Sequence, residues 1–122
     1  MIDSLLTFDD VKKDRFIIEN IRWDLEPKAL VEPKYRATPQ GVERREDRPG
    51  YIFYIDAMDK EPRLFVMRHT ASEFGKTVAR IDEAPDELIA ESMNETKERQ
   101  YFNMYPIGKR LGEWLKKELG AA

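Results

Sequence analysis

Two strand-like runs joined by a short polar turn constrain the fold of this chain more than any other feature. Residues 51–58 and 63–70 are both rich in β-branched and aromatic side chains, which favour strands. Between them stands Asp-Lys-Glu-Pro at residues 59–62, a sequence typical of a turn. The pattern predicts an antiparallel hairpin and therefore a sheet at the centre of the fold.

The hairpin divides its side chains into two sets, one for each face of the sheet. A symmetric four-residue turn predicts the pairs Met58 with Arg63, Asp56 with Phe65, Tyr54 with Met67, and Ile52 with His69. One face is then almost wholly apolar and is formed by Phe53, Ile55, Ala57, Leu64 and Val66. The other, which we call the mixed face, is formed by Ile52, Tyr54, Asp56, Met58, Arg63, Phe65, Met67 and His69. A slip of one residue would exchange the two sets, because side chains alternate along a strand.

The N-terminal region contains one predicted helix and one ambiguous segment. Thr7 and Asp10 stand at the spacing of a capping box, which predicts a short helix over residues 8–14. In residues 16–25 the apolar side chains fit both a period of two and a period of 3.6, so strand and helix are both open. The β-branched and aromatic content of residues 16–25 favours a strand.

Two helices are predicted near the C-terminus. Residues 82–87 are a suitable helix entry, because proline and acidic side chains favour the first turn, and this helix should run to about residue 99. The clearest amphipathic pattern in the chain comprises Ile107, Leu111, Trp114, Leu115 and Leu119. It begins after Pro106, and Gly120 at its end fits a C-cap.

Residues 33–50 form the longest stretch without a regular pattern. The segment contains several prolines and glycines and a run of alternating charges, which is typical of a solvated loop. Long segments without regular structure are either mobile or functional in compact domains, so we expect a mobile loop, with a lid over a site as the alternative. Residues 28–32, between two prolines, are expected as an extended or turn segment at a sheet edge.

These patterns together predict an α+β fold in a single domain that spans residues 1–122. Residues 77–81 read as a further strand, so we expect a small antiparallel sheet of three to four strands. Two C-terminal helices should cover one face of the sheet, with a short N-terminal helix beside them. A chain of 122 residues with 41% hydrophobic residues is sufficient for one core.

Composition excludes several classes of function. The chain has no Cys and one His, which excludes disulfides, thiol nucleophiles and multi-His metal centres, so we expect neither a metal nor a cofactor. A formal net charge of −3 argues against nucleic acid as a partner. The longest charge-free stretch, residues 100–108, is far shorter than the roughly 20 residues of a membrane span, and the first residues lack a secretory signal pattern. We therefore expect a soluble cytoplasmic protein.

The candidate binding residues lie on the mixed face of the hairpin. They are Tyr54, Asp56, Arg63, Phe65, Met67 and His69. A His–Asp pair can position a general base, and an Arg beside it can hold a carboxylate or phosphate. The predicted register nevertheless separates Asp56 from His69 along the strands. No complete catalytic set is found, so the sequence favours a protein without enzymatic activity.

Two functional hypotheses follow from the mixed face. The first is a non-catalytic accessory or interaction module that docks on another protein or forms a homodimer, because the large apolar side chains of this face would otherwise be bare. The alternative is a small-molecule-binding protein or small enzyme that uses the same face, with His69, Asp56 and Arg63 as its polar groups. If the N-terminal segment covers this face instead, both hypotheses lose their main support.

A second apolar cluster lies between the two predicted C-terminal helices. Its members are Tyr101, Phe102, Met104 and Tyr105. Packing in the core is the simpler interpretation of this cluster. The alternative is an exposed patch for a partner chain, because Tyr, Phe and Met are enriched at the centres of protein interfaces.

Overall fold

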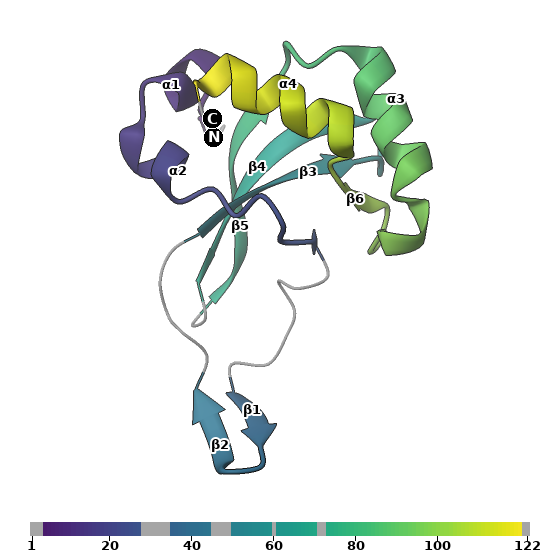
Figure 1. The fold of residues 1–122 in the computed structure, drawn as a ribbon. Coiled ribbons are helices and arrows are strands. Elements are labelled where there is room, and N and C mark those ends of the chain that lie inside the picture. Colours follow the sequence, from purple (N-terminus) through teal and green to yellow (C-terminus); the bar gives the residue numbers. More distant parts are fainter. Residues whose placement is uncertain (1–3, 28–34, 45–49, 60, 71–72, 121–122) are drawn as a thin grey trace.

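A four-stranded antiparallel sheet lies at the centre of the computed structural model, which describes residues 4–27, 35–44, 50–59, 61–70 and 73–120. Its strands are β3 (Gly50–Asp56), β4 (Arg63–Thr70), β5 (Glu73–Ile81) and β6 (Met104–Pro106), in the order β5-β4-β3-β6. The α-helices are α1 (Phe8–Lys12), α2 (Arg15–Glu19), α3 (Asp86–Glu95) and α4 (Lys109–Leu119). They cover one face of the sheet (Figure 1), which confirms the predicted α+β fold. No helix within the described ranges has the length and apolar character needed to cross a membrane.

The central hairpin forms as predicted, but its strands pair two residues away from the predicted register. Asp56 lies opposite Arg63, whereas the symmetric turn predicted Phe65 opposite Asp56. The connection between the strands is therefore longer than the four residues expected. A shift of two residues leaves every side chain on its predicted face, because side chains alternate with a period of two.

The hydrophobic core lies between the apolar face of the sheet and the helices. The sheet contributes Phe53, Ile55, Leu64, Val66, Ala79 and Ile81, all buried. The helices contribute Phe8, Val11, Ile17, Leu88, Ile89, Leu111, Leu115 and Leu119. The predicted stripe of α4 is thus buried at its three leucines, while its other two members, Ile107 and Trp114, are half-buried against the same core.

The N-terminal residues pair with both edges of the sheet. Leu6 forms a parallel bridge with Ala79 of β5, and its N–H donates to the carbonyl of Val78 at 2.9 Å. After α1 and α2, Ile21 bridges Tyr51 in the part of β3 that is an edge of the sheet, because the short strand β6 pairs only with residues 54–56. Because an open edge presents unpaired N–H and C=O groups, these bridges protect the sheet from pairing with other chains.

The predicted capping box of α1 is present. The N–H of Asp10 donates to Thr7 Oγ1 at 3.2 Å, and the N–H of Thr7 donates to the Asp10 carboxylate at 2.9 Å. The backbone and side chain of Thr7 lower the pKa of Asp10 through these hydrogen bonds. The hydroxyl-acid spacing in the sequence therefore determines where this helix begins.

The strand favoured over residues 16–25 is wrong, because its first part forms the helix α2. Asp14 begins this helix by accepting a hydrogen bond from the N–H of Ile17 at 3.1 Å. The helical period buries Ile17 in the core, and only Ile21 pairs as a strand residue would. Helix capping and packing thus outweigh the β-propensity of this short segment.

The prediction that residues 33–50 lack regular structure is also wrong in part. Strands β1 (Tyr35–Thr38) and β2 (Gly41–Arg44) pair antiparallel as a hairpin, which stands apart from the main sheet (Figure 1). Gly41 has a φ of 125°, which a glycine adopts without steric cost. Mobility of this segment stays a prediction, and residues 28–32 lie outside the described residues.

The predicted C-terminal helices form with adjusted boundaries. Pro85 precedes α3, and Gly120 ends α4 in the left-handed conformation with a φ of 70°, as its C-cap position predicts. The helix expected to reach residue 99 stops at Glu95 and is followed by a 3-10 turn, η2 (Lys97–Arg99). Strand β6 was not predicted, because three residues are too few to show an alternating pattern.

Candidate functional site

The mixed face of the hairpin, on the side of the sheet away from the main core, is largely covered by the chain itself. Ile52, Tyr54 and Met67 are only 0%, 4% and 7% exposed. They pack with Leu25, Phe65 and Met104. The prediction that the apolar side chains of this face are bare is therefore wrong for these three residues. Leu25 belongs to the N-terminal segment, so the alternative in which that segment covers the face holds for this part of it.

The polar residues of the mixed face do not converge. His69 pairs with Gly50 at one end of the hairpin, whereas Asp56 pairs with Arg63 at the other. Six residues of strand separate these ends, which is roughly 20 Å at the rise of a strand. Asp56 Oδ1 instead accepts the backbone N–H of Met58 at 2.9 Å. The three groups of the enzyme hypothesis are therefore not brought together.

A shallow hollow beside Phe65 contains two of the predicted site residues. It measures about 680 Å³ and is lined by Asp59, Glu61, Arg63, Phe65 and Arg80. Arg63 lies 3.7 Å from Glu61, and Arg80 donates to both carboxylate oxygens of Asp82 at 2.8 and 3.2 Å. Because both guanidinium groups are paired with carboxylates, this hollow has no excess positive charge with which to recruit an anion.

Tyr54 makes the best-defined polar contact of the mixed face. Its hydroxyl lies 2.7 Å from Thr77 Oγ1, and its ring stacks on Phe65 with 5.6 Å between the centroids. Burial raises the pKa of Tyr54; the hydrogen bond to Thr77 lowers it and the charge of Asp56 raises it, both by less. The phenol is thus a neutral, hydrogen-bonded part of the packing.

We expect Tyr54→Phe to lower the free energy of unfolding at pH 7 by about 1 kcal/mol, the usual net value of one hydrogen bond. Because the folded pKa is raised, the stabilisation from the neutral phenol is fully present below the unfolded value of 10.0 and is lost as pH rises through the folded pKa. The variant should therefore lose less stability than the wild type above pH 10. Urea unfolding at pH 8 and at pH 10.5 measures both effects; equal alkaline losses in the two proteins would contradict the assignment.

The most exposed large apolar side chains among the described residues lie at the end of the sheet beside the β3–β4 turn. Phe102 is 74% exposed and Met58 is 66% exposed. Asn103 links them, because its Nδ2 lies 3.4 Å from Met58 Sδ and its carbonyl accepts the N–H of Ala57 at 3.0 Å. We call Met58, Phe102 and Asn103 the turn patch.

The backbone of the turn patch has an unusual conformation. Phe102 and Asn103 have φ angles of 50° and 59°, and Tyr101 and Met104 exchange two backbone hydrogen bonds of 2.8 Å around them. Two-residue turns with positive φ favour Asn and Gly, because a bulky side chain is crowded there. Asn103 satisfies this preference, whereas Phe102 costs about 1–2 kcal/mol in this conformation. The ring of Tyr101 contacts that of Phe102 edge-on, with 4.5 Å between the centroids.

The aromatic cluster predicted between the C-terminal helices is therefore divided. Tyr105 packs against the core, and Met104 packs under the mixed face. Phe102 belongs to neither of these clusters and is exposed. Packing in the core is thus confirmed for Met104 and Tyr105, whereas a partner-binding role for the exposed Phe102 stays a prediction.

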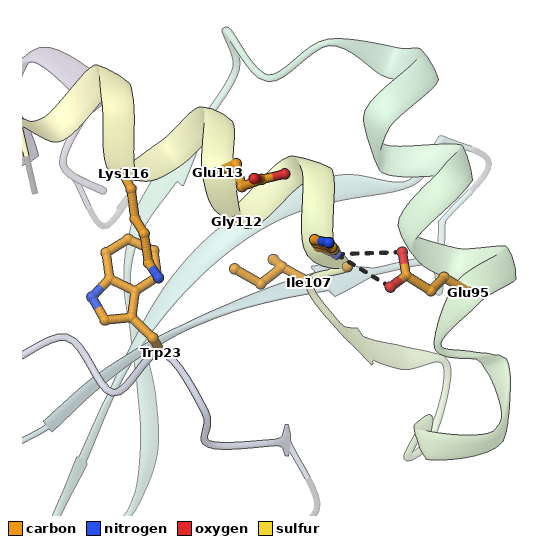
Figure 2. Close-up of a pocket in the computed structure, with 8 residues that line it drawn as sticks. Trp23, Glu95, Ile107, Gly112, Glu113 and Lys116 are labelled. Carbon is orange, nitrogen blue, oxygen red and sulfur yellow. Dashed lines mark hydrogen bonds between the residues drawn. The ribbon is translucent and has the colours of Figure 1, made fainter. Parts of the chain in front are cut away.

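A groove of about 510 Å³ runs between α4 and Trp23 (Figure 2). Its apolar lining includes Trp23, Ile107 and Gly112, and its charged lining consists of Glu95, Lys109, Glu113 and Lys116. The ring of Trp23 packs on Phe53 with 5.4 Å between the centroids, and Lys116 Nζ lies 5.2 Å from the Trp23 centroid. The groove thus has an aromatic wall with an ammonium group above it.

A polar junction between α3 and α4 closes one end of the groove. The N–H of Gly108 donates to Ser92 Oγ at 2.9 Å, and Thr96 Oγ1 donates to the Ser92 carbonyl at 2.7 Å. Both oxygens of Glu95 lie 3.3 Å from the N–H of Lys109, the first residue of α4 (Figure 2). The negative charge of Glu95 therefore interacts favourably with the positive, N-terminal end of the α4 dipole.

Gly112 lines the groove in the interior of α4. A Cβ at this position would meet only Ile107 Cδ1, at the ordinary contact distance of 3.6 Å. Packing therefore does not require a glycine here, although glycine in a helix interior costs about 1 kcal/mol relative to alanine. Its effect is to leave the groove open down to the helix backbone.

Trp23 and Gly112 were not among the predicted site residues. Gly112 carried a signal, because a helix-disfavouring residue stands inside the clearest amphipathic pattern of the chain. Trp23 carried none, since only the folded arrangement places it beside α4. Within the described part of the chain, no three Asp, Glu or His side chains are placed to hold a metal ion together.

No protein-family description, curated protein or solved structure matches this chain. The class of this protein is therefore described from its own fold and surface. It is an α+β protein with helices on one face of an antiparallel sheet, an exposed aromatic turn, and a groove along its last helix.

Proposed function

We propose that this protein is a non-catalytic interaction module that docks on another protein chain through the turn patch. Phe102 carries the proposal, because it is 74% exposed and has a φ of 50°. The crowded backbone opposes folding, and a ring that stays in water contributes little burial energy to offset this cost. A residue that strains the backbone while its ring stays largely exposed is explained by a contribution elsewhere, and binding a partner is the contribution suited to an exposed ring.

The surroundings of Phe102 fit the centre of a small interface. Phe and Met are enriched at such centres, and charged side chains are enriched at the rim. Met58 extends the apolar surface, while Asp59 and Glu61 follow it in the sequence and are exposed. The cytoplasmic location expected from the sequence is part of this proposal.

We expect Phe102→Asn to raise the free energy of unfolding by about 1 kcal/mol, because asparagine tolerates the positive φ of this position better than phenylalanine does. Thermal and urea unfolding measure this change. A fall in stability would show that the Phe102 ring contributes to the fold, and the proposal would lose its main support.

The same variant tests binding. Three tagged proteins are used to capture proteins from a lysate of the source organism under chemical cross-linking: the wild type, Phe102→Asn and a matched control, Phe16→Asn. The control removes a 53% exposed ring from α2. We expect a protein that wild type and Phe16→Asn retain in equal amounts and that Phe102→Asn loses. Equal recovery of all cross-linked proteins by the three baits would contradict the proposal.

A further inference from the structure

We infer that the partner of the turn patch inserts an arginine or lysine side chain into a pocket between α3 and the β3–β4 turn. The inference rests on the proposed function and names the chemistry of the partner. The pocket has a volume of about 510 Å³, and its lining is formed by Glu61, Pro62, Asp86, Ile89, Ala90 and Met93. It combines apolar side chains with two carboxylates, and it is separate from the groove along α4.

The lining of this pocket has the two parts that a long basic side chain requires. Ile89 is buried and Met93 is half-buried, whereas Glu61 and Asp86 are exposed. The pocket is thus apolar in its depth and acidic at its opening. Arginine and lysine bury an aliphatic stem against apolar surface and keep the charged end in water. A hydrated metal ion would gain nothing from the apolar part.

The charges of the pocket are unbalanced. None of its lining residues is basic. The guanidinium groups of the neighbouring hollow are already paired, Arg63 with Glu61 at 3.7 Å and Arg80 with Asp82 at 2.8 Å. The carboxylate of Asp86 has no hydrogen bond or ion pair within the described part of the chain. An incoming cation therefore meets a carboxylate that has no counter-ion of its own.

The contact between Arg63 and Glu61 leaves the second carboxylate accessible. The two side chains are 46% and 80% exposed, and their charged atoms are 3.7 Å apart. An exposed ion pair of this kind contributes little to stability. Glu61 can therefore turn to a cation of the partner at small cost.

The pocket adjoins the turn patch. Glu61 follows Met58 by three residues in the same turn, and Asp59 and Glu61 both line the hollow beside Phe65. A partner segment that covers Met58 and Phe102 therefore lies within reach of the pocket. One partner can thus bury the apolar centre and place a basic side chain at the acidic rim, which is the usual arrangement of protein interfaces.

The experiment titrates the isotope-labelled protein with a short basic peptide, acetyl-Gly-Leu-Arg-Leu-Arg-Gly-amide, and follows binding by two-dimensional NMR. We expect saturable shifts of the backbone amides of Ala90 and Met93, which line the pocket. The matched control peptide has citrulline in place of both arginines, because citrulline has nearly the same shape and no charge. It should cause several-fold smaller shifts at these two amides. Added salt should weaken binding of the arginine peptide, since the carboxylates are exposed.

Two variants connect the shifts to the carboxylates. Asp86→Asn and Glu61→Gln each remove one charge at the pocket with little change in shape. We expect each to raise the Kd of the arginine peptide about two- to fivefold, the effect of one exposed ion pair. The matched control, Glu87→Gln, removes a charge from the next residue of α3, which is exposed and does not line the pocket. It should leave the Kd nearly unchanged.

Three results would overturn the inference. The first is the absence of shifts at Ala90 and Met93, and the second is equal shifts with the arginine and citrulline peptides. The third is an equal rise in Kd in all three variants, because the net charge of the protein and not the pocket would then explain binding.

Failure here is distinguishable from failure of the proposed function. If the arginine peptide does not bind at the pocket but capture of a protein still depends on Phe102, the turn patch binds a partner of different chemistry and only this inference is wrong. If capture does not depend on Phe102, the proposed function is wrong, and the inference about its partner falls with it.

Discussion

Replacing Leu115 by alanine is expected to lower the free energy of unfolding by about 2–5 kcal/mol, the range for a large aliphatic side chain removed from a packed core. Leu115 is 0% exposed and belongs to the core cluster between α4 and the sheet. The neighbouring backbone is helical and held at both ends, so it cannot collapse fully into the cavity. Urea unfolding monitored by circular dichroism measures the change.

The adjacent residue provides a comparison on the same helix. Trp114 is half-buried and stacks on Phe8 with 5.6 Å between the centroids, so part of its ring is already in water. We therefore expect Trp114→Ala to cost less than Leu115→Ala, although tryptophan is the larger side chain. Lys117→Ala, at an exposed position, should leave stability nearly unchanged. A larger loss for Trp114→Ala than for Leu115→Ala would contradict the burial assigned to this helix.

The two glycines of α4 and its N-cap should respond to alanine in opposite directions. At Gly108 a Cβ would lie 2.5 Å from Glu95 Oε2 and 3.1 Å from the backbone Cα of Ser92. The Glu95 side chain can rotate away, but the Ser92 backbone cannot move without disturbing α3. We expect Gly108→Ala to lower the free energy of unfolding by about 1–3 kcal/mol, the usual cost of overpacking.

Gly112→Ala is the matched control for this prediction. Its Cβ meets only Ile107 Cδ1 at 3.6 Å, so the helix gains a better helix former without a clash. We expect an increase of about 0.5–1 kcal/mol in the free energy of unfolding. Thermal and urea unfolding of both variants measure these changes. If the free energy of unfolding rises in both variants, the α3–α4 junction is not as tightly packed as described.

Elements with local signals could be predicted from the amino-acid sequence. The capping box of Thr7 and Asp10 places the start of α1, and Gly120 places the end of α4. The division of the hairpin into an apolar and a mixed face was also predictable, because it depends only on whether a residue number is odd or even. For that reason it survived a two-residue error in the register.

The candidate site was less accessible to sequence reasoning. The mixed face was recognised as a set, but its cover by Leu25 depends on where a distant segment passes. Phe102 and Met58 were both noted, one in an aromatic cluster and one on the hairpin, yet nothing in the sequence places them together. They lie in the same part of the fold because β6 pairs with β3, which brings Asn103 beside Ala57 and Met58.

Three further features depend on packing between distant segments of the chain. This packing chose between the two periods of residues 16–25, because burial of Ile17 against the core favours the helix over a weak strand propensity. It set the hairpin register, because the length of a polar connection is not encoded in the alternation of the strands. It exposed Phe102 and opened the groove at Gly112, since exposure is a property of what packs nearby and not of the residue itself. Local hydrogen bonds and periodicity can be read along a chain, whereas packing between segments far apart in the sequence exists only once the chain has folded.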